Sequence, residues 1–313
     1  MLACWAGWGG LAVGATIVKL DKGLTHFLEL SKGQGPSRQL ELWDQLVEAP
    51  DREFYEVLVW NDKARKPARL REWIPELLRL EPRIKQAFGD FNKLVDTEIS
   101  AFRQRFPDAK LDQPIYAALA PTFNGRTGTL RHRQILAFGL DSMLERGDDP
   151  NVLFAHELFH LYHAQHSGIV DDGVMSHQPL TVPLWTEGLA TYASGLLNPS
   201  KKDGELLFEP ELAQIPASKI PELARSFLRV AGKSATGDDY GTWFNLGAAK
   251  LDKDLPNRCG YLLGLNLVRR VAGFHSLPEM VSWGPLQVHR MVVAQLSEMA
   301  MEGAPHDASA IFR

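Results

Sequence analysis

Cysteine and excess charge of either sign are both scarce in this sequence. The chain of 313 residues contains two cysteines, Cys4 and Cys259, too few and too far apart for a disulfide framework or a cysteine metal motif. The net charge is only -4, and no run of lysine or arginine forms a basic stripe, so a nucleic-acid partner is not expected. Hydrophobic residues make up 45% of the chain, which is enough for a globular protein with a sizeable core.

Two common catalytic motifs are also absent. Neither G-x-S-x-G nor G-x-x-x-x-G-K-[ST] occurs, so the sequence does not support a serine hydrolase or a P-loop NTPase. The chain begins with an uncharged segment, residues 1–18, which lacks the basic start of a signal peptide and is short for a membrane anchor. A signal sequence, an anchor and a buried segment all stay open, as do an exported or cell-envelope location and a cytoplasmic one.

The periodicity of apolar residues predicts an α+β fold that is mainly helical. Residues 19–110 are expected to form an N-terminal helical subdomain, in which prolines at 50, 67, 75 and 82 divide the chain into several short helices. Residues 111–313 are expected to form a second domain. They include two short apolar runs that predict strands, Pro114–Ala120 and Gln134–Gly139, with turn residues between them. Helices are expected over residues 150–166, 183–197, 258–272 and most of 277–300.

The clearest chemical signal is His156-Glu157-Leu158-Phe159-His160, in a helix that Asp149 and Pro150 are expected to begin. Residues four apart lie on one helix face, so the two imidazoles can bind the same metal ion. Glu157 projects about 100° round the helix from His156. It therefore lies beside the metal, where it can act as a general base toward an attacking water.

A catalytic zinc needs a third protein ligand, and two residues compete for this place. His166 has the right spacing for H-E-x-x-H-x-x-G-x-x-H, but His163 replaces the glycine that would turn the chain. Without that turn, His166 is expected about 240° round the helix from His160. Glu187, in the second predicted helix, is therefore favoured.

The surroundings of Glu187 support this choice. Tryptophan, leucine, alanine and tyrosine flank it, and a charge in such surroundings needs a partner. Small residues follow it on the same helix. We expect them to let this helix approach the zinc helix closely; they are Gly188, Ala190, Ala193 and Gly195.

These motifs resemble the gluzincin class of zinc metallopeptidases. The resemblance rests on H-E-x-x-H at residues 156–160 and on Glu187-Gly188-Leu189-Ala190. Within that class, the sequence is most similar to the bacterial predicted zinc-dependent proteases, which carry an E-G-L-A helix after the zinc helix. The resemblance implies that residues 111–313 form a zincin-like metallopeptidase domain, with a small mixed sheet and one Zn²⁺ per chain. It also implies a strand that pairs with extended substrate, for which Gln134–Gly139 is the candidate. Thr191 stands where many gluzincins carry an acid that orients a metal histidine.

A zinc peptidase also needs a donor for the developing oxyanion. Tyr261 is favoured over Tyr192, Tyr240 and His275, because it lies in an R-x-G-Y-x-x-G pattern that related proteins share. Arg258 of the same pattern is a candidate partner of the substrate or of the fold.

Three functions remain open from the sequence. The leading one is a zinc-dependent peptidase with a peptide or protein substrate, in which Glu157 is the general base. The others are a binding or scaffold protein that retains zinc, and a zinc hydrolase of other amides or esters. A membrane contact is expected only through residues 1–18, and the sequence predicts no oligomeric state.

Overall fold

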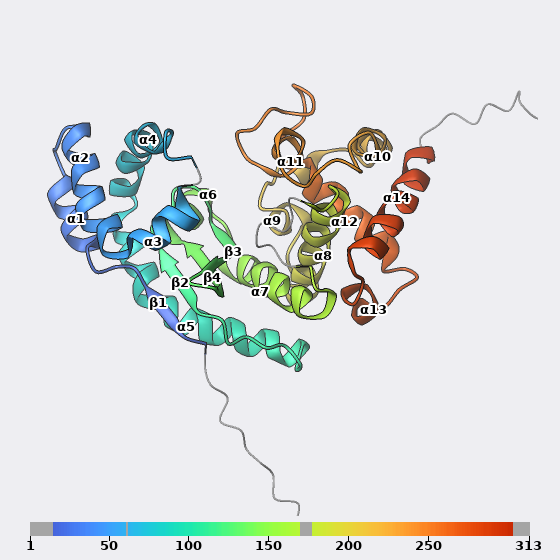
Figure 1. Cartoon of the computed structure of the whole chain (residues 1–313), viewed down its shortest axis with the longest axis horizontal. Coiled ribbons are helices and arrows are strands. Elements are labelled where there is room, and N and C mark those ends of the chain that lie inside the picture. The colour runs from blue at the N-terminus through green and yellow to red at the C-terminus, as the bar shows by residue number, and fades with distance from the viewer. Residues whose placement is uncertain (1–14, 61, 170–176, 303–313) are drawn as a thin grey trace, which may run out of the picture.

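A four-stranded mixed sheet lies among the N-terminal helices (Figure 1). The computed structural model of the chain describes residues 15–60, 62–169 and 177–302. The strand order is β1-β2-β4-β3, with β1 and β4 parallel to β2 and with β3 antiparallel to β4. The strands are β1 (Ile17–Lys19), β2 (Ile115–Ala118), β3 (Gly125–Leu130) and β4 (Arg133–Gly139). The two predicted strands correspond to β2 and β4, and an α+β fold that is mainly helical is confirmed.

Strand β3 was not predicted, because its residues were assigned to a turn. It forms a hairpin with β4 through Arg131 and His132, whose φ angles are 51° and 61°. Two-residue turns with positive φ usually carry asparagine or glycine, so the sequence lacks the ordinary hairpin signal. The structure also corrects the expectation that Gln134–Gly139 pairs with substrate. Strand β4 already pairs with β2 and β3, and the edge strands of the described sheet are β1 and β3.

The prolines of the N-terminal region do not divide it into short helices throughout. Pro75 lies inside α4, and Pro82 lies in the first turn of α5, where proline is well tolerated. Helix α5 then continues for 25 residues and buries one apolar face. The helices are α1 (Leu24–Ser31), α2 (Pro36–Trp43), α3 (Arg52–Phe54), α4 (Lys66–Arg79) and α5 (Glu81–Arg105).

The later helices follow the predicted ranges closely. Residues 277–300 are interrupted once, between α13 and α14, and α6 was not predicted. The helices are α6 (Leu140–Arg146), α7 (Pro150–Ser167), α8 (Thr181–Leu197), α9 (Asp203–Leu206), α10 (Ile220–Leu228), α11 (Asp238–Phe244), α12 (Cys259–Val271), α13 (Leu277–Val281) and α14 (Pro285–Met301).

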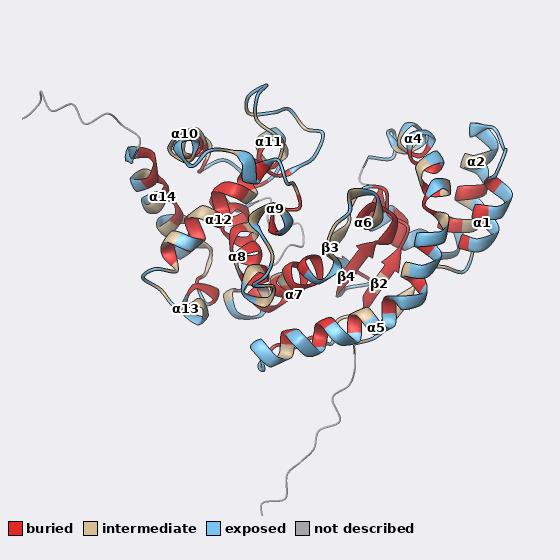
Figure 2. Ribbon diagram, turned by 180° about the vertical axis from the view of Figure 1, so that it is seen from behind, coloured by how far each residue is buried: buried red, intermediate tan, exposed pale blue. Residues whose placement is uncertain are grey.

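Helix α7 lies between two groups of elements. The sheet and the N-terminal helices are on one side of it, and α8–α14 are on the other (Figure 1). Buried residues line the sheet, α7 and α8 (Figure 2). They belong to one hydrophobic core that continues across residue 110. The H-E-x-x-H helix is therefore held within the core by both groups.

The end of the uncharged N-terminal segment is part of the sheet. Ile17 and Val18 belong to β1 and pair with Ile115 and Tyr116 of β2. Residues 1–14, which carry most of the predicted signal or anchor segment, lie outside the described residues. Among the helices that are described, none has the length and apolar character needed to span a membrane.

The contact between α8 and α12 is made through two glycines. A Cβ atom on Gly188 would lie 2.4 Å from the backbone of Gly264, and one on Gly264 would lie 2.6 Å from the carbonyl oxygen of Leu184. Gly188 therefore serves the approach of α8 to α12, and the expectation that it serves the zinc helix α7 is wrong. Helix α8 contacts α7 elsewhere, where Ser194 Oγ donates to the carbonyl oxygen of Val152 at 2.8 Å.

Glu98 in α5 makes the stability of this fold depend on pH. Its side chain is buried, and burial followed by the charge of Asp149 raises its pKa from 4.5 to about 7. The folded state thus holds this proton more tightly than the unfolded chain. The cost of ionising Glu98 is absent below pH 4.5, grows up to pH 7 and stays constant above it.

Glu98→Gln is therefore expected to raise the free energy of unfolding by about 1–3 kcal/mol at pH 8 and by little at pH 5. Urea unfolding at the two pH values measures this difference. Asp96→Asn, at an exposed position of the same helix, is the matched control. An equal effect of Glu98→Gln at both pH values would contradict the assignment.

Candidate metal centre

Helix α7 is well defined at both ends. The Asp149 side chain accepts hydrogen bonds from the backbone N–H groups of Asn151 (2.9 Å) and Val152 (3.3 Å), and Pro150 occupies the first helical position. Gly168 ends the helix in the left-handed conformation, with a φ of 70°. These local signals fix the phase of the helix, so residues 156 and 160 are presented on the same face.

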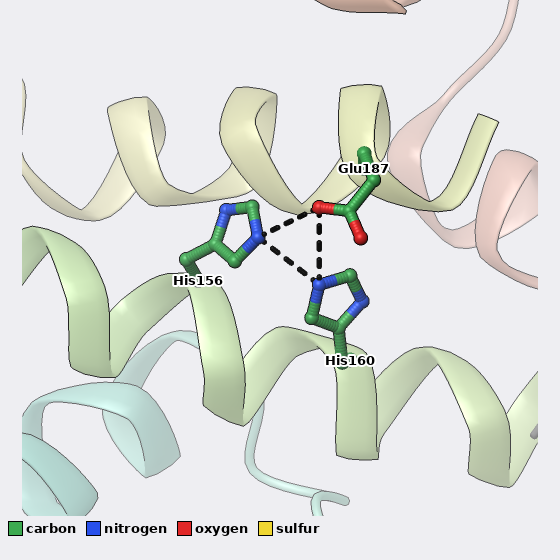
Figure 3. A group of neighbouring side chains, drawn as sticks. All are labelled: His156, His160 and Glu187. Atoms are coloured by element: carbon green, nitrogen blue, oxygen red, sulfur yellow. Dashed lines mark hydrogen bonds and ion pairs between the residues drawn. The ribbon is translucent and has the colours of Figure 1, made fainter. Parts of the chain in front are cut away.

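Three side chains converge between α7 and α8 (Figure 3). His156 and His160 project from α7, and Glu187 projects toward them from α8. The Nε2 atoms of the two histidines are 3.0 Å apart. Glu187 Oε2 lies 3.2 Å from Nε2 of His156 and 3.6 Å from Nε2 of His160. The structure thus brings together three of the residues singled out in the sequence.

The spacing of these atoms fits a single zinc ion. The ligands of a tetrahedral zinc with bonds of about 2.0–2.1 Å lie about 3.3 Å from one another. The three observed separations, 3.0, 3.2 and 3.6 Å, scatter around that value. Two histidines and a glutamate also form a donor set found at catalytic zinc sites, which keep a fourth position open. The group could therefore hold a metal ion.

Electrostatics favours the ligand forms of two of these side chains. Burial lowers the pKa of His156 to about 4, so its imidazole is neutral at pH 7. Burial alone would raise the pKa of Glu187, but the charge of His160 and the hydrogen bonds from both histidines outweigh it and hold that pKa well below its usual range. A neutral imidazole and an ionised carboxylate are the forms that bind zinc.

Glu157 is buried beside the metal group and lies against the edge strand β3. A Cβ atom on Gly125, the first residue of β3, would lie 2.9 Å from Cγ and 3.0 Å from Oε1 of Glu157. A larger residue at position 125 would therefore displace the carboxylate. The contact of Gly125 with Glu157 could not be predicted from the sequence, because no local motif connects the two residues.

His166 lies away from the three ligands. Its Nε2 is 3.3 Å from Asp108 Oδ2, and its ring packs against Tyr162 with centroids 4.5 Å apart. His163 is buried, and its ring stacks on Phe159. Among the residues that the structure describes, neither histidine belongs to a group that could hold a metal.

Tyr261 lies beside the metal group. Its ring stacks over His156 with centroids 6.2 Å apart. Burial, and then the charge of Glu187, raise the pKa of its hydroxyl, so the group stays protonated and can donate a hydrogen bond.

The other candidates for the oxyanion donor lie in different surroundings. The Tyr240 ring packs against Phe244. His275 Nδ1 lies 2.7 Å from a carboxylate oxygen of Glu279. Tyr192 is partly buried and packs against the hydrophobic core.

Thr191 does not orient a metal histidine. Its hydroxyl donates to the carbonyl oxygen of Glu187 at 2.8 Å, within its own helix. In the described part of the chain, Nδ1 of His156 is buried and has no hydrogen-bond partner. An acidic residue at position 191 would be expected to supply one, as such partners usually do at zinc sites.

Comparisons of the chain with protein-family models, curated proteins and solved structures found no match.

Proposed function

We propose that this protein is a zinc-dependent hydrolase that cleaves peptide bonds. The observation that carries the proposal is the convergence of His156, His160 and Glu187 in a zinc-like arrangement with a buried glutamate beside them. A structural zinc site has four protein ligands and needs no adjacent base, whereas a catalytic site has three and an open position. The gluzincin resemblance of the motifs supports the same proposal and a zincin-like core.

Each side chain has a distinct role in this proposal. Zinc held by His156, His160 and Glu187 would supply Lewis acidity, which makes water a stronger nucleophile at neutral pH. Glu157 accepts the proton of the attacking water and passes it to the leaving amine. The Tyr261 hydroxyl donates a hydrogen bond to the developing oxyanion. Among the described residues, no strand pairs with the outer edge of β3 next to Glu157, and an extended peptide could add there as a further strand.

Removal of the metal tests the proposal. We expect the purified protein to cleave peptides from a mixed-sequence library, to lose this activity on chelation and to recover it with about one equivalent of zinc per chain. Cleavage products are identified by mass spectrometry, and simple esters are assayed in parallel. Activity that survives complete zinc removal would contradict the proposal. A fully zinc-loaded protein that cleaves no peptide would indicate a binding protein, and cleavage of esters alone would indicate a different hydrolase.

A further inference from the structure

Arg258 occupies a position that ordinarily favours a smaller residue. It immediately precedes α12 with a φ of 64°, in the left-handed region where glycine and asparagine are the usual residues. Its side chain is only 7% exposed. A backbone strained in this way around a buried charge is typical of functional sites, where a particular side chain is required.

The guanidinium of Arg258 has one buried nitrogen without a hydrogen-bond partner among the described residues. In the described part of the chain, its Nη1 atom is buried and has no hydrogen-bond partner, whereas another part of the guanidinium is hydrogen-bonded to the Tyr261 side chain. The acids whose charges reach it are already engaged. Asp148 lies 3.4 Å from Arg146 Nε and accepts a hydrogen bond from Asn124 Nδ2 at 2.7 Å, and Glu187 faces the two histidines. A buried cation in this state is stabilised by any anion that can reach it.

Arg258 lies next to the metal group. Its Cζ is 4.0 Å from the centroid of the Tyr261 ring, and that ring stacks over His156 with centroids 6.2 Å apart. One residue of extended peptide spans about 3.3–3.6 Å. A group one to three residues from a scissile bond at the metal centre would therefore come within reach of the guanidinium.

We propose that Arg258 binds a carboxylate of the peptide substrate, and that this contact selects substrates with an anionic group close to the scissile bond. The inference rests on the proposed peptidase function and specifies its substrate class. A guanidinium can hold a carboxylate through two parallel N–H···O bonds, and the orphaned Nη1 can provide one of them. The carboxylate can come from the C-terminus of the peptide or from an aspartate or glutamate side chain.

Matched peptides separate these two sources. Four versions of one cleavable peptide combine a free or amidated C-terminus with aspartate or asparagine near the scissile bond. We expect kcat/KM to be about 10- to 100-fold higher for the version with the recognised carboxylate, the range expected for a charge-assisted hydrogen bond. A gain from the free C-terminus alone identifies a terminal carboxylate, and a gain from aspartate alone identifies a side chain. Equal rates for all four peptides would overturn the inference while leaving the peptidase proposal intact.

Variants then assign the preference to Arg258. Arg258→Met is expected to bring the ratio of kcat/KM between the charged and uncharged peptides close to one, whatever the rate on the uncharged peptide, and Arg258→Lys is expected to retain part of the preference. Arg269→Met is the control, since Arg269 lies in α12, the helix that Arg258 precedes, and pairs with Asp203. If Arg258→Met folds but keeps the full preference, the carboxylate is bound elsewhere and the inference fails. If it does not fold, the Arg258→Lys variant provides the comparison.

Binding provides a readout that does not depend on catalysis. Calorimetry of zinc-loaded Glu157→Gln protein with an acetylated tetrapeptide is expected to show tighter binding of the free acid, or of the aspartate version, than of its uncharged counterpart. The same difference in a wild-type protein that cleaves no peptide would support carboxylate recognition and reject the peptidase proposal. Equal binding of the charged and uncharged peptides would reject carboxylate recognition.

Discussion

Replacing Glu157 with glutamine is expected to lower kcat/KM for peptide hydrolysis by a factor of about 10²–10⁴ while zinc stays at about one ion per chain. The substitution preserves the size of a buried side chain that has little room beside Gly125. Glutamine cannot accept the proton of the attacking water, so the chemical step loses its base. Two measurements on the same preparation test this expectation. The rate of peptide cleavage gives the loss of kcat/KM, and elemental analysis gives the zinc content.

Glu145→Gln is the matched control for this experiment. Glu145 is exposed on α6, and its replacement is expected to change neither the rate nor the zinc content. Full activity of Glu157→Gln would remove Glu157 as the general base. Loss of zinc together with activity would instead show that Glu157 supports the metal group, and the rate could not then be assigned to proton transfer.

Replacing Glu187 with alanine is expected to lower zinc affinity by at least about tenfold, so that the purified variant contains far less than one zinc per chain. The reason is geometric, since Glu187 Oε2 lies within 3.6 Å of both histidine Nε2 atoms and completes the group of three ligand atoms. Elemental analysis of identically purified wild type and variant measures the change. Peptide cleavage is expected to fall with the zinc content.

His166→Ala separates the two candidate third ligands. His166 lies beside Asp108, so its removal is expected to leave zinc at the wild-type level. Unchanged zinc in Glu187→Ala together with lost zinc in His166→Ala would reverse the assignment. Circular dichroism of both variants shows whether lost zinc reflects a missing ligand or a chain that has not folded.

The features predicted successfully from the sequence are those with local physical causes. Helix α7 was predicted because Asp149, Pro150 and Gly168 define its ends, and the spacing of its histidines then places both on one face. Strand β3 was missed because Arg131 and His132 adopt positive φ without the usual turn residues. Here the pairing with β4 determines the turn, and that pairing cannot be recognised from a short stretch of sequence.

The parts of the site that could not be predicted from the sequence depend on contacts between distant segments of the chain. The sequence suggested that Glu187 faces a partner, since a carboxylate among apolar residues needs one. It did not reveal which neighbour Gly188 faces, because helical periodicity gives a side of a helix and not the element packed there. The contact between Gly125 and Glu157 likewise joins a strand to a helix and leaves no motif in either.

The paired glycines of α8 and α12 have an evolutionary consequence. Because a methyl group at Gly188 or Gly264 would overlap the backbone of the opposite helix, the two positions are constrained jointly. Related sequences should keep small residues at both positions even where the metal ligands have been lost. In a search for distant relatives, the glycine pair would therefore identify proteins that share the fold, whereas the H-E-x-x-H motif would identify those that also keep the metal ligands.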